Sequence, residues 1–194
     1  MAANIRSVVV FCGSRVGNDP AWRSAAEALG RGLASSGIRL IYGGGRVGLM
    51  GAVADGALAA GGAVTGIIPD FLRAREVAHP GVTDLLVTDS MHTRKALMFE
   101  QADAFVTLPG GMGTLDETIE IITWRQLGLH DRPVLIANIN GWATSMIAVL
   151  NGFVTDGFAD ASSRALYEVL PDAPAILRRL LTLPARMPAD SARV

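Results

Sequence analysis

A glycine-rich loop between a predicted strand and a predicted helix is the part of this sequence best suited to chemistry. Residues 104–108 form a short apolar run typical of a buried strand, and Leu108–Glu117 then reads LPGGMGTLDE. Glycine leaves the main chain open to close approach, and the first N–H groups of a helix attract an anion. Because ligands bind at the carboxyl ends of strands in open α/β sheets, this loop is predicted to bind a phosphate.

Two side chains of the loop allow a second interpretation. Thr114 and Glu117 have the spacing of a capping box, in which a hydroxyl and a carboxylate satisfy amides of the first helical turn. A cap does not need the three glycines that precede it, Gly110, Gly111 and Gly113. We therefore favour membership of a phosphate site over a purely capping role.

A segment with two adjacent cations lies shortly before this loop. Asp89–Met98 predicts a helix with Asp89 or Ser90 as its N-cap, and Arg94 and Lys95 follow near its start. Exposed cations there oppose the helix dipole by about 0.3–1 kcal/mol each, and a bound anion reverses the sign of that interaction. Arginine also suits a bidentate grip on phosphate or carboxylate. We expect both cations to contact an anionic ligand rather than solvent alone.

Another glycine-rich loop follows the second predicted strand. Gly43–Gly51 contains Gly-x-Gly-x-x-Gly in a strand–turn–helix context, which is the fingerprint of dinucleotide sites. Its position after the second strand, and the presence of a further phosphate loop, favour one mononucleotide pocket instead. Gly44 and Gly45 are predicted to line that pocket. Gly48 and Gly51 could equally serve only to let the helix pack closely on the strand.

Three residues follow the first predicted strand at its carboxyl end. Cys12 is interpreted as a small packed residue, because no histidine lies near it in the sequence. Ser14 and Arg15 either contact a ligand or cap the following helix, and the sequence leaves both alternatives open.

Composition limits the classes of function. The chain has 194 residues, of which half are apolar, and a net charge of −1, which argues against a nucleic-acid partner. One cysteine excludes an internal disulfide, and the spacing of three histidines does not suggest a metal site. No apolar run reaches the ~18 residues of a membrane span. We expect a cytoplasmic protein without metal, cofactor, membrane or nucleic-acid partner.

Regular alternation of strand and helix patterns predicts the fold class. We expect an α/β, Rossmann-like, doubly wound parallel sheet in a single domain over residues 1–184, with a flexible tail at 185–194. The strands are predicted at 7–12, 38–42, 63–69, 82–88, 104–108, 133–138 and 165–170.

Two motifs together resemble the Lonely Guy (LOG) family of cytokinin riboside 5′-monophosphate phosphoribohydrolases. They are Pro109–Glu117 and the upstream Met91–Lys95, and both Gly43–Gly51 and Ile121–Gly128 are similar to further family stretches. The resemblance implies a hydrolase that cleaves the N-glycosidic bond of N6-substituted adenosine 5′-monophosphates. Its products are a free base and ribose 5-phosphate. It also implies a homodimer.

The resemblance implies roles for individual residues. Arg94 and Glu117 are catalytic, although it stays open whether Arg94 anchors the phosphate or assists the leaving base. From its local sequence alone, Glu76 is better interpreted as a solvated surface carboxylate. The residues implied to line the nucleotide site are Glu76, Lys95, Gly110, Gly111, Gly113, Thr114 and Thr123.

Three other functions compete with this one. Members of the family have been labelled lysine decarboxylases, but that chemistry relies on pyridoxal phosphate held by a pocket lysine. Lys95 is the only lysine, and anion binding explains it more simply. A non-catalytic nucleotide- or cofactor-binding Rossmann-like protein remains the alternative. A nicotinamide-dependent oxidoreductase is disfavoured, since no chain remains for a substrate domain.

The helix after the glycine loop also predicts assembly. Its apolar residues surround so wide an arc that a partner beyond its own sheet is expected. We predict a homodimer packed through this helix and the one at 142–151, with Glu117 close to the interface. The apolar residues concerned are Ile119, Ile122, Trp124, Leu127, Trp142, Met146 and Leu150.

Overall fold

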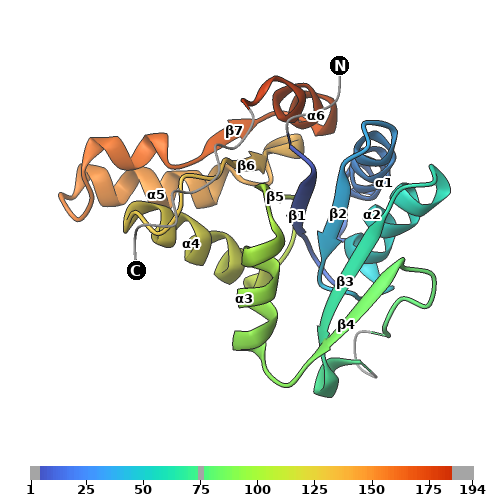
Figure 1. The fold of residues 1–194 in the computed structure, drawn as a ribbon. Coiled ribbons are helices and arrows are strands. Elements are labelled where there is room, and N and C mark those ends of the chain that lie inside the picture. The colour runs from blue at the N-terminus through green and yellow to red at the C-terminus, as the bar shows by residue number, and fades with distance from the viewer. Residues whose placement is uncertain (1–4, 74–76, 185–194) are drawn as a thin grey trace.

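The computed structural model describes residues 5–73 and 77–184, which form seven parallel strands and six α-helices with short 3-10 turns (Figure 1). The sheet has the order β4-β3-β2-β1-β5-β6-β7. The strands are β1 (Ser7–Phe11), β2 (Arg39–Tyr42), β3 (Val64–Pro69), β4 (Asp84–Thr88), β5 (Ala104–Thr107), β6 (Val134–Ala137) and β7 (Glu168–Leu170). The helices are α1 (Pro20–Ser35), α2 (Gly48–Ala59), α3 (Met91–Gln101), α4 (Met112–Gln126), α5 (Thr144–Thr155) and α6 (Ala173–Thr182).

The sheet is covered on both faces, as the continuous apolar runs of its strands require. In β1, Val8 and Val10 pack into the core beneath α1, α2 and α6. Val9 and Phe11 point to the opposite face, into the core beneath α3, α4 and α5. This period of two places every second side chain of the strand in each core. The predicted doubly wound architecture is confirmed.

The strand order reverses at β1, which pairs with β2 on one side and with β5 on the other. The chain passes outward from β2 to β4 and then returns through α3 to β5. The loops after β1 and β5 therefore diverge to opposite faces of the sheet. Such a switch point leaves a crevice at the carboxyl ends of the strands, and ligands bind there in this fold class.

All seven predicted strands are present, and the differences lie at their ends. The last predicted strand begins three residues later than expected, because residues 161–165 form a 3-10 turn instead. The helix predicted from Trp142 begins at Thr144, since a 3-10 turn at Ile139–Gly141 precedes it. The predicted tail at 185–194 lies outside the described residues. No helix in the described part of the chain is both long enough and apolar enough to span a membrane.

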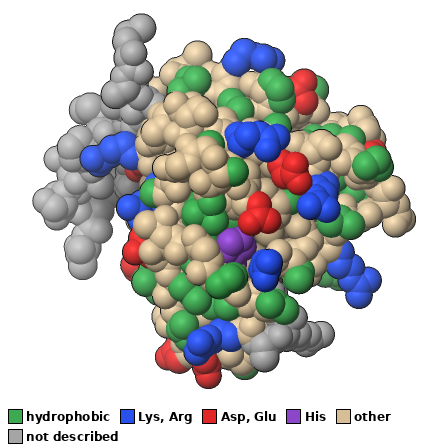
Figure 2. Space-filling view, turned by 90° about the vertical axis from the view of Figure 1, so that its right-hand side faces the viewer, with side chains coloured by type: hydrophobic (Ala, Val, Ile, Leu, Met, Phe, Trp, Pro, Cys, Tyr) green, Lys and Arg blue, Asp and Glu red, His purple; other side chains and the backbone are tan. Residues whose placement is uncertain are grey.

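The side of the molecule turned toward the viewer in Figure 2 carries a mixed surface. Cationic, anionic and hydrophobic side chains alternate across it, without one continuous apolar area. Elsewhere in the sheet, an exposed ion pair joins β2 and β4, in which Arg39 Nη1 lies 2.9 Å from Asp84 Oδ2. Exposed pairs of this kind contribute little to stability, with typical values of about 0–1 kcal/mol.

Helices α1 and α2 approach each other so closely that their backbones touch. A Cβ atom added to Gly56 of α2 would lie 2.3 Å from the carbonyl oxygen of Glu27 in α1. A Cβ added to Gly30 of α1 would lie 2.1 Å from the carbonyl oxygen of Val53. Both neighbours are backbone atoms, so neither side of the crossing can relax by moving a side chain.

We therefore expect opposite effects from the same substitution at two helical glycines. Gly56→Ala should lower the free energy of unfolding by about 1–3 kcal/mol, because the new methyl group overpacks the crossing. Gly152→Ala, in α5, meets no atom within 4 Å and should raise it by about 0.5–1 kcal/mol. Urea denaturation of both variants measures the difference, and equal effects would contradict the close crossing.

Candidate active site

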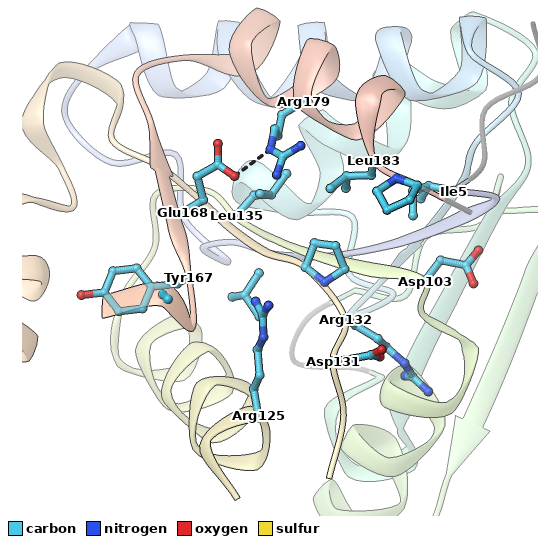
Figure 3. Close-up of a pocket in the computed structure, with 14 residues that line it drawn as sticks. Ile5, Asp103, Arg125, Asp131, Arg132, Leu135, Tyr167, Glu168, Arg179 and Leu183 are labelled. Carbon is cyan, nitrogen blue, oxygen red and sulfur yellow. Dashed lines mark hydrogen bonds and ion pairs between the residues drawn. The ribbon is translucent and has the colours of Figure 1, made fainter. Parts of the chain in front are cut away.

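A large cavity lies at the amino ends of β5 and β6. It has a volume of about 620 Å³ and is lined by Arg125, Arg132 and Arg179 among others (Figure 3). Two of its acidic residues, Glu168 and Asp103, have partners within the fold. Glu168 pairs with Arg179 at 2.7 Å, and Asp103 accepts hydrogen bonds from the Arg6 and Ser7 amides. Neither glycine-rich loop is among its lining residues, so size alone does not make it the site.

The second cavity lies at the switch point, where the crevice of this fold class is expected. It is a cleft of about 240 Å³ between the loops after β1 and β5 and the first turns of α2, α3 and α4. Five of the residues predicted from the sequence line it together. They are Arg94, Gly111, Gly113, Thr114 and Glu117. The predicted cationic segment and the predicted phosphate loop therefore meet in one cleft.

The capping-box prediction for Thr114 and Glu117 is wrong. Helix α4 begins at Met112, its N-cap is Gly111, and no side chain caps it. Thr114 is the third residue of the helix, and its buried side chain lies against Gly110, where a Cβ would be 2.1 Å from Thr114 Oγ1. The helix starts earlier than its sequence suggests because Gly110 can approach this threonine.

The start of α4 is open toward a ligand. A Cβ atom added to Gly111 or Gly113 would meet nothing within 4 Å, and both residues line the cleft. The first-turn amides of a helix without a side-chain cap carry the positive end of its dipole. This geometry suits the binding of an anion such as phosphate.

The start of α2 is closed by comparison. The amides of Leu49 and Met50 donate to the Gly13 carbonyl at 2.9 and 3.3 Å. Gly48 has φ +66°, and a Cβ there would lie 2.2 Å from the backbone of Ser14. Of the two interpretations of Gly48, close packing therefore accounts for this residue. Gly51 has the same explanation, because its Cβ would lie 1.8 Å from the Arg46 carbonyl oxygen.

Gly44 and Gly45 lie beside the cleft but are not among its lining residues. Gly45 pairs with Ala78 in an isolated bridge, and the Gly44 carbonyl accepts the His79 amide at 2.9 Å. Their backbone is thus paired with the segment that returns from β3. Substrate binding by these two glycines stays a prediction.

Arg94 reaches from α3 across the switch point to the loop after β2. Ser90 caps α3 as predicted, because its hydroxyl accepts the Thr93 amide at 3.1 Å. The Arg94 side chain is then buried to 5% exposure, and its Nη2 donates to the Gly43 carbonyl at 3.1 Å. A Cβ atom at Gly43 would lie 2.1 Å from Nη2, so a larger residue there would displace the guanidinium from this position. The guanidinium is held in the wall of the cleft.

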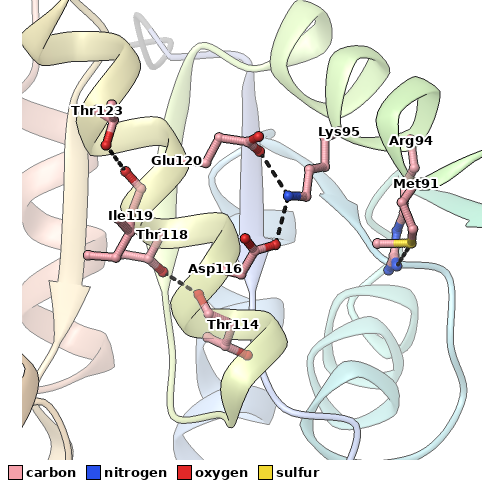
Figure 4. Close-up of polar contacts among 9 residues, drawn as sticks. All are labelled: Met91, Arg94, Lys95, Thr114, Asp116, Thr118, Ile119, Glu120 and Thr123. Atoms are coloured by element: carbon pink, nitrogen blue, oxygen red, sulfur yellow. Dashed lines mark hydrogen bonds and ion pairs between the residues drawn. The ribbon is translucent and has the colours of Figure 1, made fainter.

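Lys95 points away from Arg94 and toward α4 (Figure 4). Its Nζ lies 2.7 Å from Asp116 Oδ2 and 3.2 Å from Glu120 Oε2. Partial burial lowers the pKa of Lys95, but the bonds to these two carboxylates outweigh it and raise the pKa above its usual value. Lys95 does not line the cleft, so its predicted contact with the nucleotide is not tested by this geometry.

Cys12 is close to both predicted catalytic residues. Burial raises the pKa of its thiol strongly, the nearby Glu117 carboxylate raises it further, and Arg94 opposes the shift. A thiol with a raised pKa is a poor nucleophile, because the thiolate is the reactive form. The packing interpretation of Cys12 is confirmed.

Some predicted site residues lie elsewhere. Thr123 is exposed on the fourth turn of α4, nine residues after Thr114 and thus about 13 Å farther along the helix. Its hydroxyl donates to the Ile119 carbonyl at 2.8 Å. Glu76 lies outside the described residues.

The remaining loop residues settle one open alternative. Asp19 is the N-cap of α1 and accepts the Ala21 amide at 2.8 Å, so Ser14 and Arg15 do not cap that helix. Ser14 lines the cleft instead. Sequence reasoning missed Leu72 as a lining residue, which only the return of the chain after β3 brings to the cleft.

The buried thiol gives a direct test of the cleft wall. At pH 9 an ordinary cysteine, with a pKa of about 8.5, is mostly thiolate. Because Cys12 is the only cysteine, an aromatic disulfide reagent should release less than one tenth of an equivalent of thiol product from the folded protein. The same protein in urea should react fully. Rapid reaction of the folded protein would show that the wall is open.

Comparison with known proteins identifies the family of this chain. The model of a family described as "Possible lysine decarboxylase" matches residues 50–180. The probable cytokinin riboside 5′-monophosphate phosphoribohydrolase LOGL9 of Oryza sativa subsp. japonica is 44% identical over 178 residues, which cover 92% of this chain and 78% of the relative. The cytokinin riboside 5′-monophosphate phosphoribohydrolase of Rhodococcoides fascians is 44% identical over 168 residues, which cover 86% and 85%.

A solved structure agrees with the fold. The molybdenum cofactor carrier protein of Chlamydomonas reinhardtii has a TM-score of 0.69 and 20% identity, with 92% of this chain and 99% of that one covered. This likeness concerns the fold alone. The family is assigned from the sequence, because two relatives are 44% identical over most of this chain and most of their own length. The chain belongs to the Lonely Guy (LOG) family, as its two signature motifs implied.

Proposed function

We propose that this protein hydrolyses the N-glycosidic bond of N6-substituted adenosine 5′-monophosphates, such as cytokinin riboside 5′-monophosphates. The products are the free base and ribose 5-phosphate. One observation supports this most directly: a carboxylate, Glu117, and a buried guanidinium, Arg94, line the same cleft as the uncapped start of α4. The names of relatives that are 44% identical agree with it.

The 5′-phosphate is proposed to bind at the start of α4. Gly111 and Gly113 leave room for close approach, and the helix dipole favours a dianion. Gly110 and Thr114 contribute by shaping the loop, since the glycine lets the threonine pack over it. A substrate without the phosphate loses these interactions, so nucleosides should be poor substrates.

The chemical step needs a carboxylate beside the sugar. As the bond from C1′ to the base nitrogen breaks, its electron pair leaves with the base and positive charge develops on the ribose. Glu117 stabilises that charge and accepts a proton from the attacking water, whose oxygen bonds to C1′. The departing base takes up a proton from bulk water at its nitrogen, and Glu117 returns its proton to bulk water, so that one water is consumed for each bond broken. Arg94 supplies positive charge either to the phosphate or to the leaving base.

A decarboxylase function is not supported by the only lysine of the chain. Schiff-base chemistry requires a neutral amine, whereas Lys95 is held as a cation between two carboxylates. Its side chain also points away from the cleft residue Arg94 (Figure 4). The arrangement of these side chains therefore does not support the lysine decarboxylase activity that the family description names.

We also propose that the enzyme is a homodimer packed through α4 and α5. A cleft of about 240 Å³ is smaller than the roughly 300–1,000 Å³ of typical ligand pockets, which suggests that a second copy completes it. Of the apolar residues on which the dimer was predicted, only Leu127 is strongly exposed. Ile122 is buried in the core of the chain itself, and the partly buried residues packed against that core are Trp124, Trp142, Met146 and Leu150. The large apolar side chains left for a partner are Met112 and Leu115 of α4, Leu127 at its end, and Val149 and Phe153 of α5. Neighbouring apolar side chains of this kind mark interaction surfaces.

The remaining expectations follow the same proposal. Residues 1–184 are taken as one catalytic domain, which the single seven-stranded sheet supports. A cytoplasmic location is supported by the cysteine content. The chain has a single cysteine and so no internal disulfide, and disulfides are typical of proteins in oxidising compartments. Glu76 and Thr123 are retained as predicted substrate-binding residues, with Thr123 reaching a site only through assembly.

The function is tested by turnover of adenosine 5′-monophosphate and its N6-isopentenyl derivative, with free base and ribose 5-phosphate quantified. Glu117→Gln should reduce the turnover number by about 100- to 10,000-fold, because the amide cannot accept a proton or stabilise positive charge. Glu100→Gln, an exposed change on α3, is the matched control and should stay active. Nucleotide binding without base release by the wild type would favour the non-catalytic alternative.

Assembly is tested by two matched substitutions on opposite faces of the sheet. Leu127 and Leu181 are both exposed, at 68% and 48%, but only Leu127 lies at the end of α4. Leu127→Glu should halve the mass measured by light scattering and lower activity, because a charge is costly in an apolar interface. Leu181→Glu should leave both unchanged. A fully active monomer at assay concentration would contradict the proposed dimer.

A further inference from the structure

We propose that Lys95 is a positioning residue that fixes α3 against α4 and so sets the place of Glu117 opposite Arg94. This assignment rests on the hydrolytic function proposed above. It differs from the substrate-binding role that the family resemblance implied for this lysine. The cluster formed by Lys95, Asp116 and Glu120 is called the Lys95 bridge below.

The bridge connects the two helices that carry the proposed catalytic residues. Lys95 follows Arg94 directly on α3, and Asp116 precedes Glu117 directly on α4. Asp116 and Glu120 are four residues apart, so they share one face of α4, and the lysine Nζ contacts both at 2.7 and 3.2 Å (Figure 4). A shift of either helix would break at least one of these contacts.

Glu117 lies where the bridge meets the cleft, and Asp116 of the bridge lines the cleft as well. Glu117 lines the cleft together with Arg94, and it also lines the seam between α3 and α4 together with Lys95 and Glu120. That seam is closed by Phe11, Phe99 and Ile121 and leaves a void of only about 10 Å³. The carboxylate therefore has little space to move when the seam is closed. The bridge spans the polar side of the same seam.

The electrostatic environment of Lys95 disfavours a phosphate there. The lysine side chain is only 19% exposed and that of Glu120 only 29%, so this contact is partly shielded from water. With two carboxylates and one ammonium, the bridge has a net negative charge. A phosphate dianion would be repelled by the two acids, whereas the start of α4 offers a dipole of the favourable sign.

A second set of contacts fixes α4 from the other side. Thr118 Oγ1 donates to the Thr114 carbonyl at 2.6 Å and lies 2.9 Å from Thr107 Oγ1 of β5. These buried hydroxyls hold the first turn of α4 on the sheet. Lys95 holds the opposite, more exposed side of the next turn. Together the two sets of contacts resist rotation of α4 about its own axis, which is the motion that would turn Glu117 out of the cleft.

The two roles for Lys95 predict different kinetic changes. Loss of a positioning residue misplaces the carboxylate, and displacements near 1 Å can cost about 100-fold in rate. The turnover number should therefore fall while KM for the nucleotide stays nearly constant. Loss of a phosphate ligand should instead raise KM and reduce the preference for nucleotide over nucleoside.

The experiment is a double-mutant cycle on the 194-residue chain with N6-isopentenyl adenosine 5′-monophosphate. Lys95→Met should lower kcat by at least about tenfold with KM changed by less than about threefold, and Glu120→Gln should act in the same direction. The double variant should be no worse than Lys95→Met alone, because the contact that Glu120→Gln weakens is already lost in Lys95→Met. Lys95→Glu combined with Glu120→Lys should recover part of the kcat lost in Lys95→Glu.

The outcomes separate this inference from the function on which it rests. An active wild type with a Lys95→Met variant of unchanged kcat, or with a raised KM alone, would overturn the positioning role only. Additive losses in the double variant would also overturn it. A wild type that releases no base would overturn the proposed function and this inference with it. If Lys95→Met does not fold, Glu120→Gln and the exchanged pair decide the question, since each keeps an ion pair across the seam.

Discussion

The arrangement of the loops around the cleft depends on backbone hydrogen bonds at one residue, Gly13. Its amide donates to the Pro109 carbonyl at 3.0 Å, and its carbonyl accepts the Leu49 amide at 2.9 Å. The loops after β1, β2 and β5 are thus joined through a single residue. A Cβ at this position would lie 3.2 Å from the Gly110 Cα, which is tighter than most real contacts. The three loops can converge only because two glycines meet where they cross.

This meeting point gives the two glycine-rich loops different tasks. The loop after β2 uses its glycines to pack on the loop after β1, and the first amides of α2 are occupied by Gly13. The loop after β5 touches the same residue through Pro109 and Gly110, and from Gly111 onward it opens on the cleft. Both loops contain glycines in similar spacing. The sequence therefore predicts that the backbone of each loop is approached closely, but it does not distinguish approach by another loop from approach by a ligand.

The limits of the sequence prediction follow from which contacts are local. Strand positions and the parallel architecture depend on apolar periodicity within each segment, and they were predicted. The start of α4 depends on Gly110 meeting Thr114 and Gly13, of which the last is distant in sequence, and the predicted cap was therefore misplaced. Arg94 and Lys95 were correctly singled out as unusual cations. Their divergence could not be predicted, because it depends on Gly43 for one and on α4 for the other.

The sparse use of lysine leaves this molecule with a nearly constant charge in the mildly alkaline range. Only one cysteine, one lysine and two tyrosines could titrate there, since the other basic side chains are arginines that keep their proton. The pKa values of all four groups are raised above their ordinary values. Between about pH 8 and pH 9 these side chains therefore keep one predominant protonation state. A rate that changes in that interval would report on the nucleotide, its leaving base or the chain's terminal amine rather than on the wall of the cleft.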